Sequence, residues 1–493
     1  MSQEDGLQNT VQRLATGVSG LDRILEGGVL EGGVYILVGA PGAGKTILAN
    51  QMAFHQVQQG RKVAYITLLA ESHSRMLTHL KGLSYFDASV LSERLLYMSA
   101  FRTLEETGLS GLLELLRREI RTHKITLLII DGLVQAQESA STARDFKKFI
   151  HELQSFAHLT RCTTLLLTSA VGEVVAAEHT MVDGVIELND EAFELRKTRE
   201  LEVRKFRGSS FLRGRHSFRI TDEGLVVHPR IETTVGHAPQ QPPEGDPRCP
   251  FGVEGLDAML AGGVPMFTST MLSGTVGSGK TVLGLQFLAE GARRREKGLY
   301  FNFYESPPML IRKAARLGLD LQSAVDEGWV HFQWQPPLEL QADVMAELLF
   351  SRVRELGIQR LVFDGLEALM NSFVHPPRVT HFIAALTQEL RVLGVTALFT
   401  HEAPNLVGPE VPVPLGPGVS ASAENLLFVR QVELAGQLRR LICIWKARDT
   451  EFDSTLREFV ISHAGVKVLA PMPGAGQLTG EARSALSLAG RGE

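Results

Sequence analysis

Residues 39–46, with the sequence GAPGAGKT, decide how the first half of this chain folds, and residues 274–281, GTVGSGKT, do the same for the second half. Both stretches fit the pattern G-x-x-x-x-G-K-[ST]. Each follows an apolar run and precedes a helix-like pattern, which is the context of a phosphate-binding loop between a strand and a helix. A glycine-rich turn without a ligand is the alternative, and two correctly placed copies favour the phosphate-binding loop.

The residue types in these loops suit a nucleoside triphosphate. Glycines let backbone N–H groups surround phosphate oxygens, and the following helix adds positive potential at its amino end. We expect Lys45 and Lys280 to contact the β- and γ-phosphates of ATP, and Thr46 and Thr281 to ligate Mg²⁺. The predicted ATP-binding residues are Gly39, Ala40, Pro41, Gly42, Ala43, Gly44, Lys45 and Thr46, and Gly274, Thr275, Val276, Gly277, Ser278, Gly279, Lys280 and Thr281.

The similarity extends upstream of the two loops. Residues 16–46 read TGVSGLDRILEGGVLEGGVYILVGAPGAGKT, and residues 251–281 read FGVEGLDAMLAGGVPMFTSTMLSGTVGSGKT. The shift between the copies is constant, because 252 − 17 and 280 − 45 both equal 235. A single register over such a length indicates a duplicated domain.

Length and composition fit this interpretation. A chain of 493 residues with 44% hydrophobic and 21% charged residues predicts two to four folded domains. The net charge of −5 argues against a protein that coats nucleic acid or an anionic membrane. The 3 cysteines lie too far apart for a zinc site or disulfide framework, and no apolar run approaches the roughly 20 residues of a membrane span. We therefore expect a cytoplasmic protein.

Apolar runs alternate with amphipathic stretches in both copies. VYILVG, KVAYITLL, ITLLIID and TTLLLTS in the first copy, and TMLSG, GLYFNFY, RLVFDG and TALFT in the second, lack alternation and predict strands buried on both faces. Stretches such as 109–123 predict crossover helices. The fold class is therefore α/β twice, with mainly parallel central sheets. We place the domains at 1–230 and 249–468, an extended proline-rich linker at 231–248, and a flexible tail at 469–493.

An aspartate closes one buried strand in each copy. Asp131 ends ITLLIID and Asp364 ends RLVFD, at 86 and 84 residues from the lysines of the two loops. A strand-end aspartate can simply cap the next helix. Beside a phosphate-binding loop it predicts a second Mg²⁺-side carboxylate, the Walker B residue.

Hydrolysis also needs a group that orients or deprotonates water. Glu71 and Glu305 follow the second strand of each copy, at 26 and 25 residues from the loop lysines, and we assign both as catalytic candidates. A solvated glutamate on a loop is the alternative.

A Lys-x-Arg pair comes late in each copy. Lys205 and Arg207, and Lys446 and Arg448, stand at i and i+2 on a predicted strand, so each pair shares one face. A strand beyond the core sheet does not easily reach its own nucleotide, and we predict that the pair acts on the γ-phosphate of a neighbouring subunit. A solvated basic edge strand is the alternative.

Together these features resemble the KaiC family of RecA-like ATPases. The resemblance rests on the repeated G-V-x-G-L-D-x-x-L-x-G-G leader, the two loops, the LLIID and VFD strands, the Lys-x-Arg pairs, and FRGSS and GQLTGEARS further along. It implies two tandem RecA-like domains, a homo-hexameric two-tier ring with ATP between neighbouring subunits, and slow hydrolysis. It also implies a signalling-protein partner for the tail, and clock members phosphorylate their own second domain.

The chain departs from the clock-type members at two places. Their paired glutamates are replaced by Ala70-Glu71 and Tyr304-Glu305, so the first carboxylate is missing in both copies. Their Ser-Thr phosphorylation site corresponds to Ser420 and Ala421, which leaves Ser420, or Ser422 nearby, as the only acceptor. We do not expect a two-site phosphorylation cycle.

Three functions remain open at this point. The leading one is a ring-forming regulatory ATPase with residual kinase activity at Ser420. A RecA-like motor on DNA or RNA is the second, and the negative net charge makes a nucleic-acid partner the less favoured one. The third is a nucleotide-gated scaffold with little turnover, which the missing carboxylates favour.

Overall fold

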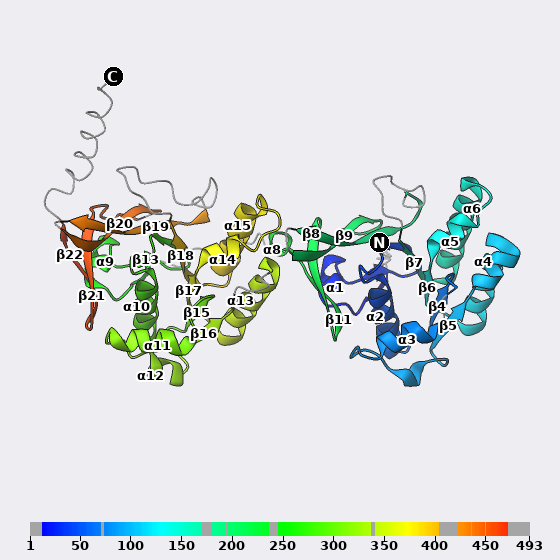
Figure 1. The fold of residues 1–493 in the computed structure, drawn as a ribbon, viewed down its shortest axis with the longest axis horizontal. Helices are drawn as coiled ribbons and strands as arrows, with labels where there is room; N and C mark the ends of the chain where they lie inside the picture. Colours follow the sequence, from blue (N-terminus) through cyan, green and yellow to red (C-terminus); the bar gives the residue numbers. More distant parts are fainter. Residues whose placement is uncertain are drawn as a thin grey trace, which may run out of the picture. The chain divides into compact units, whose positions relative to one another are not determined.

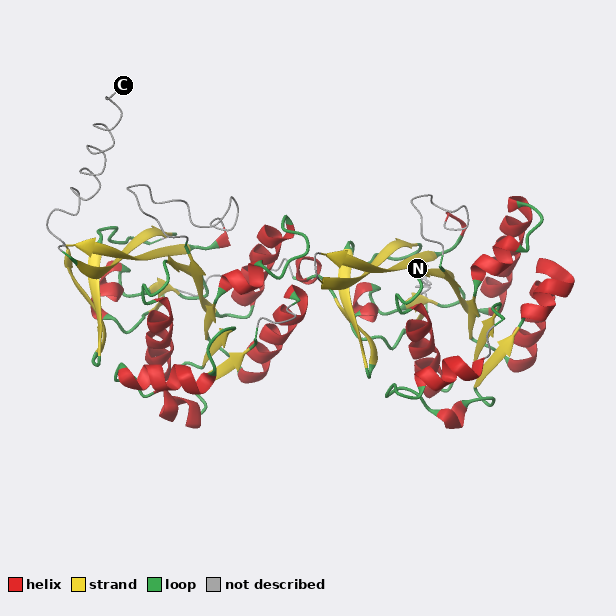
Figure 2. Cartoon of the chain, in the orientation of Figure 1, coloured by secondary structure: helices red, strands yellow, loops and turns green. Residues whose placement is uncertain are grey.

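The computed structural model describes residues 12–70, 73–169, 180–193, 196–235, 245–336, 341–403, 422–434, 436–448 and 450–471. The chain divides into two compact units, Met1–Thr234 and Val235–Glu493. Each unit contains one nine-stranded sheet and one two-stranded ribbon, with helices packed against the large sheet (Figures 1 and 2).

The sheet of the first unit has the strand order β11-β10-β9-β8-β3-β7-β6-β4-β5. Strands β8, β3, β7, β6, β4 and β5 run parallel, and β9, β10 and β11 extend the sheet in antiparallel fashion. The strands are β1 (Arg13–Leu14), β2 (Val29–Leu30), β3 (Val34–Gly39), β4 (Val63–Thr67), β5 (Leu95–Ser99), β6 (Leu127–Asp131), β7 (Thr163–Thr168), β8 (Gly184–Phe193), β9 (Arg196–Phe206), β10 (Arg215–Thr221) and β11 (Gly224–His228). The helices are α1 (Leu21–Ile24), α2 (Lys45–Gln58), α3 (His73–Leu80), the 3-10 helix η1 (Ala88–Val90), α4 (Phe101–His123), α5 (Leu133–Glu138), α6 (Ala143–Thr160) and α8 (Ile231–Thr234).

The second unit repeats this topology strand for strand. Its order is β22-β21-β20-β19-β14-β18-β17-β15-β16, so β14 takes the place of β3 and β18 that of β7. The strands are β12 (Arg248–Cys249), β13 (Val264–Pro265), β14 (Ser269–Gly274), β15 (Gly298–Asn302), β16 (Val330–Trp334), β17 (Arg360–Asp364), β18 (Thr396–Glu402), β19 (Asn425–Leu434), β20 (Gln437–Ala447), β21 (Arg457–Ser462) and β22 (Gly465–Pro471). The helices are α9 (Glu254–Met259), α10 (Lys280–Arg293), α11 (Pro307–Arg316), α12 (Leu321–Asp326), α13 (Ala342–Leu356), α14 (Leu366–Met370) and α15 (Arg378–Val392). The α/β fold with mainly parallel sheets, predicted from the sequence, is confirmed.

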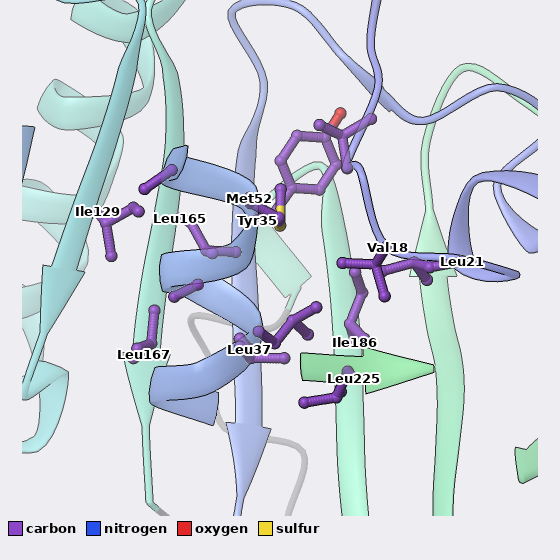
Figure 3. Packing of buried hydrophobic residues seen from close by; sticks show 14 of the residues in the cluster. Val18, Leu21, Tyr35, Leu37, Met52, Ile129, Leu165, Leu167, Ile186 and Leu225 are labelled. Atoms are coloured by element: carbon purple, nitrogen blue, oxygen red, sulfur yellow. The ribbon is translucent and has the colours of Figure 1, made fainter. Parts of the chain in front are cut away.

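Strand β3 shows why its sequence lacks alternation. Tyr35 and Leu37 belong to the cluster formed with α2, where Figure 3 shows Tyr35 beside Met52. Val34 and Ile36 point to the other face, into the cluster that contains residues of α4 and α6. Because both faces of the sheet are covered, every position of this strand has to be apolar or small.

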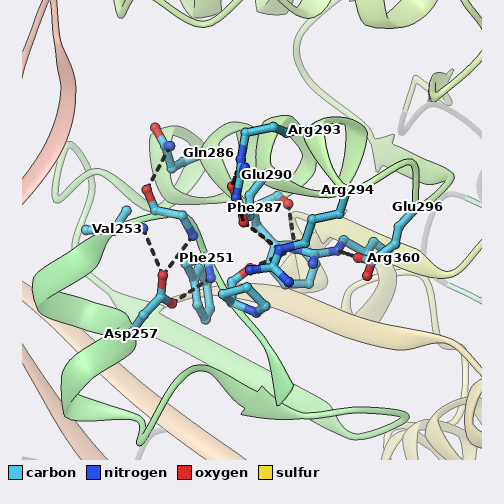
Figure 4. Close-up of polar contacts among 12 residues, drawn as sticks. Phe251, Val253, Asp257, Gln286, Phe287, Glu290, Arg293, Arg294, Glu296 and Arg360 are labelled. Atoms are coloured by element: carbon cyan, nitrogen blue, oxygen red, sulfur yellow. Dashed lines mark hydrogen bonds and ion pairs between the residues drawn. The ribbon is translucent and has the colours of Figure 1, made fainter. Parts of the chain in front are cut away.

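The repeated leader is explained by one aspartate in each copy. The carboxylate of Asp257 accepts hydrogen bonds from the backbone N–H groups of Phe251, Gly252 and Val253, at 2.7, 2.9 and 3.1 Å, as Figure 4 shows. Asp22 does the same for Thr16 and Gly17. These contacts fix the turn that leads into the short helices α9 and α1, so the leader is a structural element of the fold.

Two boundaries differ from the sequence prediction. The segment 231–248 begins with the helical turn α8, although we expected an extended linker there. The prolines that disfavour helix start at Pro239, so they do not restrict Ile231–Thr234. Strand β22 runs to Pro471, beyond the predicted domain end at residue 468, because it pairs with β21 as far as Arg457. The rest of the predicted tail lies outside the described residues.

A buried arginine, Arg360, ties the start of the second unit to its sheet. It is 1% exposed, donates to the carbonyl oxygens of Pro250 (2.7 Å) and Phe287 (3.0 Å), and pairs with Glu296 at 2.5 Å (Figure 4). Its guanidinium carbon also lies 4.7 Å from the centre of the Phe287 ring. The corresponding first residue of β6 is Leu127, so the first unit closes the same place with an aliphatic side chain.

We expect Arg360→Ala to lower the free energy of unfolding of the second unit by about 3–5 kcal/mol, because the change leaves Glu296 and two carbonyl groups without their partner. The matched control is Arg354→Ala, whose surface pair with Glu389 contributes about 1 kcal/mol or less. Urea denaturation of the full chain measures both. Equal destabilisation by the two substitutions would contradict this role of Arg360.

Candidate functional site

The two phosphate-binding loops have the same backbone conformation. Gly42 and Gly44 have φ angles of +83° and +105°, and Gly277 and Gly279 have +73° and +103°, values that other residues rarely adopt. No side chain caps the amino end of α2 or α10. The first backbone N–H groups of each helix therefore remain available to an anion.

The loop lysines arch back over their own loops. Lys45 Nζ lies 2.6 Å from the carbonyl oxygen of Gly39 and 3.0 Å from that of Ala40. Lys280 Nζ makes the same two contacts, at 2.7 Å to Gly274 and 2.9 Å to Thr275. Burial lowers the pKa of both lysines, and the carboxylates on the Walker B side oppose this shift. Both ammonium groups are thus held where a phosphate oxygen can replace a carbonyl oxygen.

The predicted Mg²⁺ ligands lie together in the second unit. Thr281 Oγ1 is 3.2 Å from Asp364 Oδ2, so the two oxygen atoms can occupy neighbouring positions around an ion with metal–oxygen distances of about 2.0–2.1 Å. Thr400 also donates a hydrogen bond to Asp364. In the first unit, Asp131 ends β6 at the matching position and lines the same pocket as Thr46. Hydroxyl and carboxylate oxygens suit Mg²⁺, so the residues present fit the ion.

Sequence reasoning missed a tyrosine in each site. Tyr65 Oη donates to Asp131 Oδ2 at 2.7 Å, and Tyr300 Oη donates to Asp364 Oδ2 at 2.6 Å. Both rings are buried, and burial raises their pKa values well above the usual range. Each tyrosine stands 20 residues after its loop lysine (65 − 45 and 300 − 280), so the repeat itself contained the signal. The hydroxyl fixes the orientation of the carboxylate that faces the metal position.

The structure describes one of the two predicted catalytic glutamates, Glu305. Glu71 lies outside the described residues. Both carboxylate oxygens of Glu305 lie 2.7 Å from Nζ of Lys313, which comes from α11. The ammonium group thus contacts both oxygens that would otherwise orient a water molecule. Glu305 therefore needs to leave Lys313 before it can accept a proton from water.

The second loop also has polar neighbours that the sequence analysis did not assign. His401, on β18, contacts Ser273 Oγ through Nδ1 at 3.1 Å, and its Nε2 lies 3.8 Å from Glu367 Oε1. Glu367 in turn accepts a hydrogen bond from the backbone N–H of Glu402. Burial lowers the pKa of His401 to about 4 and raises that of Glu367.

The first loop lacks these groups. The register pair Ser273–His401 corresponds to Val38–Thr168, and the position three residues after the Walker B aspartate is Val134 where the second unit has Glu367. Glu402, Glu367 and Asp364 all act on Lys280, whereas among the described residues Asp131 acts on Lys45. Within the described part of the chain, the second loop therefore lies in a more negative environment than the first.

The Lys-x-Arg pairs lie two strands to the side of their own loop strand and toward its amino-terminal end. Lys205 pairs in register with Val185, which stands beside Ile36, about 10 Å along β3 from the loop glycine Gly39. Lys205 Nζ donates to the carbonyl oxygen of Thr180 at 2.7 Å.

The remaining members of the two pairs occupy matching places. Arg207 donates to the carbonyl oxygens of Thr180 and Met181. Lys446 donates to that of Ala423 at 2.7 Å, and the side chain of Arg448 is exposed. This placement keeps both pairs away from the nucleotide position of their own unit. Ser420, the predicted acceptor, lies outside the described residues.

Comparison with known proteins identifies the family. The family model for KaiC ATPases matches residues 14–232 and 249–472. The chain belongs to the KaiC ATPase family. The circadian clock oscillator protein KaiC of Picosynechococcus sp. is 25% identical over 479 residues, covering 95% of this chain and 91% of that protein. The circadian clock oscillator protein KaiC 1 of Synechocystis sp. is 24% identical over 467 residues, covering 92% and 88%.

The family assignment confirms the resemblance found in the sequence. It also confirms that the chain is a KaiC-like ATPase with two tandem repeats. None of the helices in the described part of the chain has the length and apolar composition needed to cross a membrane.

We predict that acidification destabilises the second unit through His401. Its folded pKa of about 4 lies below the ordinary value of 6.5, so the unfolded chain binds the proton first as the pH falls. Stability is then fully present above pH 6.5 and declines toward pH 4, by up to about 3 kcal/mol.

Denaturation curves between pH 7.5 and 4 for the wild type and His401→Gln measure this loss. The His401→Gln variant should lose less stability between pH 6.5 and pH 4 than the wild type, since glutamine does not titrate. Parallel stability profiles for the two proteins would contradict this role of His401.

Proposed function

We propose that this chain is a ring-forming, cytoplasmic regulatory ATPase that binds and hydrolyses Mg²⁺-ATP at one site in each unit. The observation that supports it most strongly is that lysine, threonine, tyrosine and Walker B aspartate recur around both loops with matching contacts. Family membership supports the ATPase activity.

The chain's own residues supply binding and orientation. The loop N–H groups and Lys45 or Lys280 neutralise and position the β- and γ-phosphates. Thr46 and Asp131, and Thr281 and Asp364, would hold Mg²⁺, which when bound would supply charge stabilisation on the phosphate oxygens. Tyr65 and Tyr300 keep the aspartates in the orientation that this requires.

The water-orienting step falls to the glutamates after the second strand. In the second unit Glu305 has to exchange its pair with Lys313 for water, and this exchange is a physical reason for slow turnover. In the first unit Glu71 occupies the corresponding sequence position.

The Lys-x-Arg pairs imply assembly. Each pair stands two strands from its own loop strand and toward the amino-terminal end of that strand, where a neighbouring subunit's nucleotide can meet it. We propose a homo-hexameric ring with ATP at the subunit interfaces, in which Lys205, Arg207, Lys446 and Arg448 stabilise charge on the γ-phosphate in trans. A signalling protein that binds the C-terminal tail is part of the same proposal.

A nucleotide-gated scaffold is the second candidate. The pair between Glu305 and Lys313 favours it, because both carboxylate oxygens contact the ammonium group and not a water molecule. Glu305→Gln separates the two candidates. The substitution should slow phosphate release if the chain is an ATPase, and it should leave the residual phosphate release unchanged if the chain is a scaffold.

We expect Lys45→Ala and Lys280→Ala each to weaken ATP binding at one site by at least about tenfold, because each removes a charged contact to the phosphates. The double variant should lose both phosphate release and nucleotide-dependent assembly. Phosphate release and light scattering with and without ATP measure these effects, with Lys81→Ala as an exposed-lysine control. Unchanged ATP binding and assembly in the double variant would contradict the proposal.

Residual autophosphorylation is tested separately. Incubation with Mg²⁺-ATP followed by mass spectrometry should find one phosphate, at Ser420, in the wild type and none in the Lys280→Ala variant. A phosphate that persists in Lys280→Ala would exclude the second site as its source.

A further inference from the structure

A pocket of about 540 Å³ opens beside the predicted metal position of the first unit. One end is formed by Thr46, Thr67 and Asp131, and the other by helix α3. A γ-phosphate bound by the first loop would lie at the inner end, because Thr46 and Asp131 are the residues assigned to the metal that contacts it.

Helix α3 places basic groups in this pocket. Arg75 and His79 are four residues apart, so they lie on one side of the helix, and both line the pocket with His73. Neither Arg75 nor His79 forms an ion pair or a side-chain hydrogen bond among the described residues. The inner end of the pocket is thus acidic and the outer end basic.

His73 contributes a neutral ring to this pocket. Its Nε2 atom is shielded from solvent and has no hydrogen-bond partner in the described part of the chain, while the ring bonds to the backbone of Met98. Burial lowers the pKa of His73, so the ring is neutral at pH 7. The positive charge that the pocket offers to phosphate therefore comes from Arg75.

We propose that this pocket is a holding site for inorganic phosphate released by ATP hydrolysis in the first unit. The inference rests on the proposed function. Water attacks the γ-phosphorus, the bond to the β,γ-bridging oxygen breaks, that oxygen stays with ADP, and one proton is released. The hydrogen phosphate moves away from Asp131 toward Arg75, whose planar guanidinium can make paired hydrogen bonds to two phosphate oxygens.

The second unit lacks this arrangement. At the corresponding shift of 234 residues (305 − 71), Pro307 replaces His73, Met309 replaces Arg75, and Lys313 replaces His79. Lys313 is already paired with both oxygens of Glu305. Phosphate retention therefore belongs to the first unit and makes product release there slower than cleavage, whereas the second unit is slowed before cleavage.

Single-turnover kinetics test the proposal on the full chain. Acid quench measures cleavage of labelled ATP, and a fluorescent phosphate sensor measures free phosphate. In the wild type we expect phosphate to appear after cleavage, and in Arg75→Ala we expect release about tenfold faster with unchanged cleavage, because one charged contact is lost. Met309→Ala, at the matched position of the second unit, should leave the lag as in the wild type. Coincident cleavage and release in the wild type, or a lag that Arg75→Ala preserves, would overturn the proposal.

A second measurement does not depend on turnover. Titration with inorganic phosphate in the presence of ADP should show binding that Arg75→Ala weakens about tenfold. Equal phosphate binding by wild type and Arg75→Ala would overturn the pocket assignment. Absence of ATP cleavage with normal phosphate binding would instead contradict the proposed function and leave the pocket supported.

Discussion

The backbone junction between β3 and α2, and its repeat between β14 and α10, is the constraint on which the rest of each unit depends. Gly44 and Gly279 adopt φ angles near +105°, and a Cβ atom on either would lie 3.0 Å from an isoleucine side chain. Only glycine permits this turn, and the turn directs the first N–H groups of a buried helix toward one point. The strand before it is covered on both faces, so the loop cannot shift without disturbing the core.

The charged residues around this junction differ between the two units. Among the residues that the structure describes, Lys45 acts with Asp131, whereas Lys280 is surrounded by Asp364, Glu367 and Glu402. A nucleotide that carries several negative charges meets more repulsion in the second unit, so a divalent cation is more important there. In our proposal, the phosphate pocket of the first unit and the Glu305–Lys313 pair of the second unit make different steps of the same reaction slow.

The fold was predictable because its main features can be read directly from the order of the residues. These features are the two loops, the unbroken apolar strands and the constant shift of 235 residues between the copies. Helix 109–123 was expected and forms the longer part of α4, because Gly108 has a non-helical backbone that separates this part from the turns before it. The cluster of Ser273, His401 and Glu367 was not predictable, because its members come from β14, β18 and α14. Tyr65 and Tyr300 could have been found, since they recur at one spacing from the lysines.

The stoichiometry of ATP binding tests the central claim of two unlike sites most directly. Equilibrium titration with ATP and Mg²⁺ should give two nucleotides per chain in two phases, with the weaker phase more dependent on Mg²⁺ and absent in Lys280→Ala. One nucleotide per chain, or two equivalent sites with the same Mg²⁺ dependence, would contradict the account.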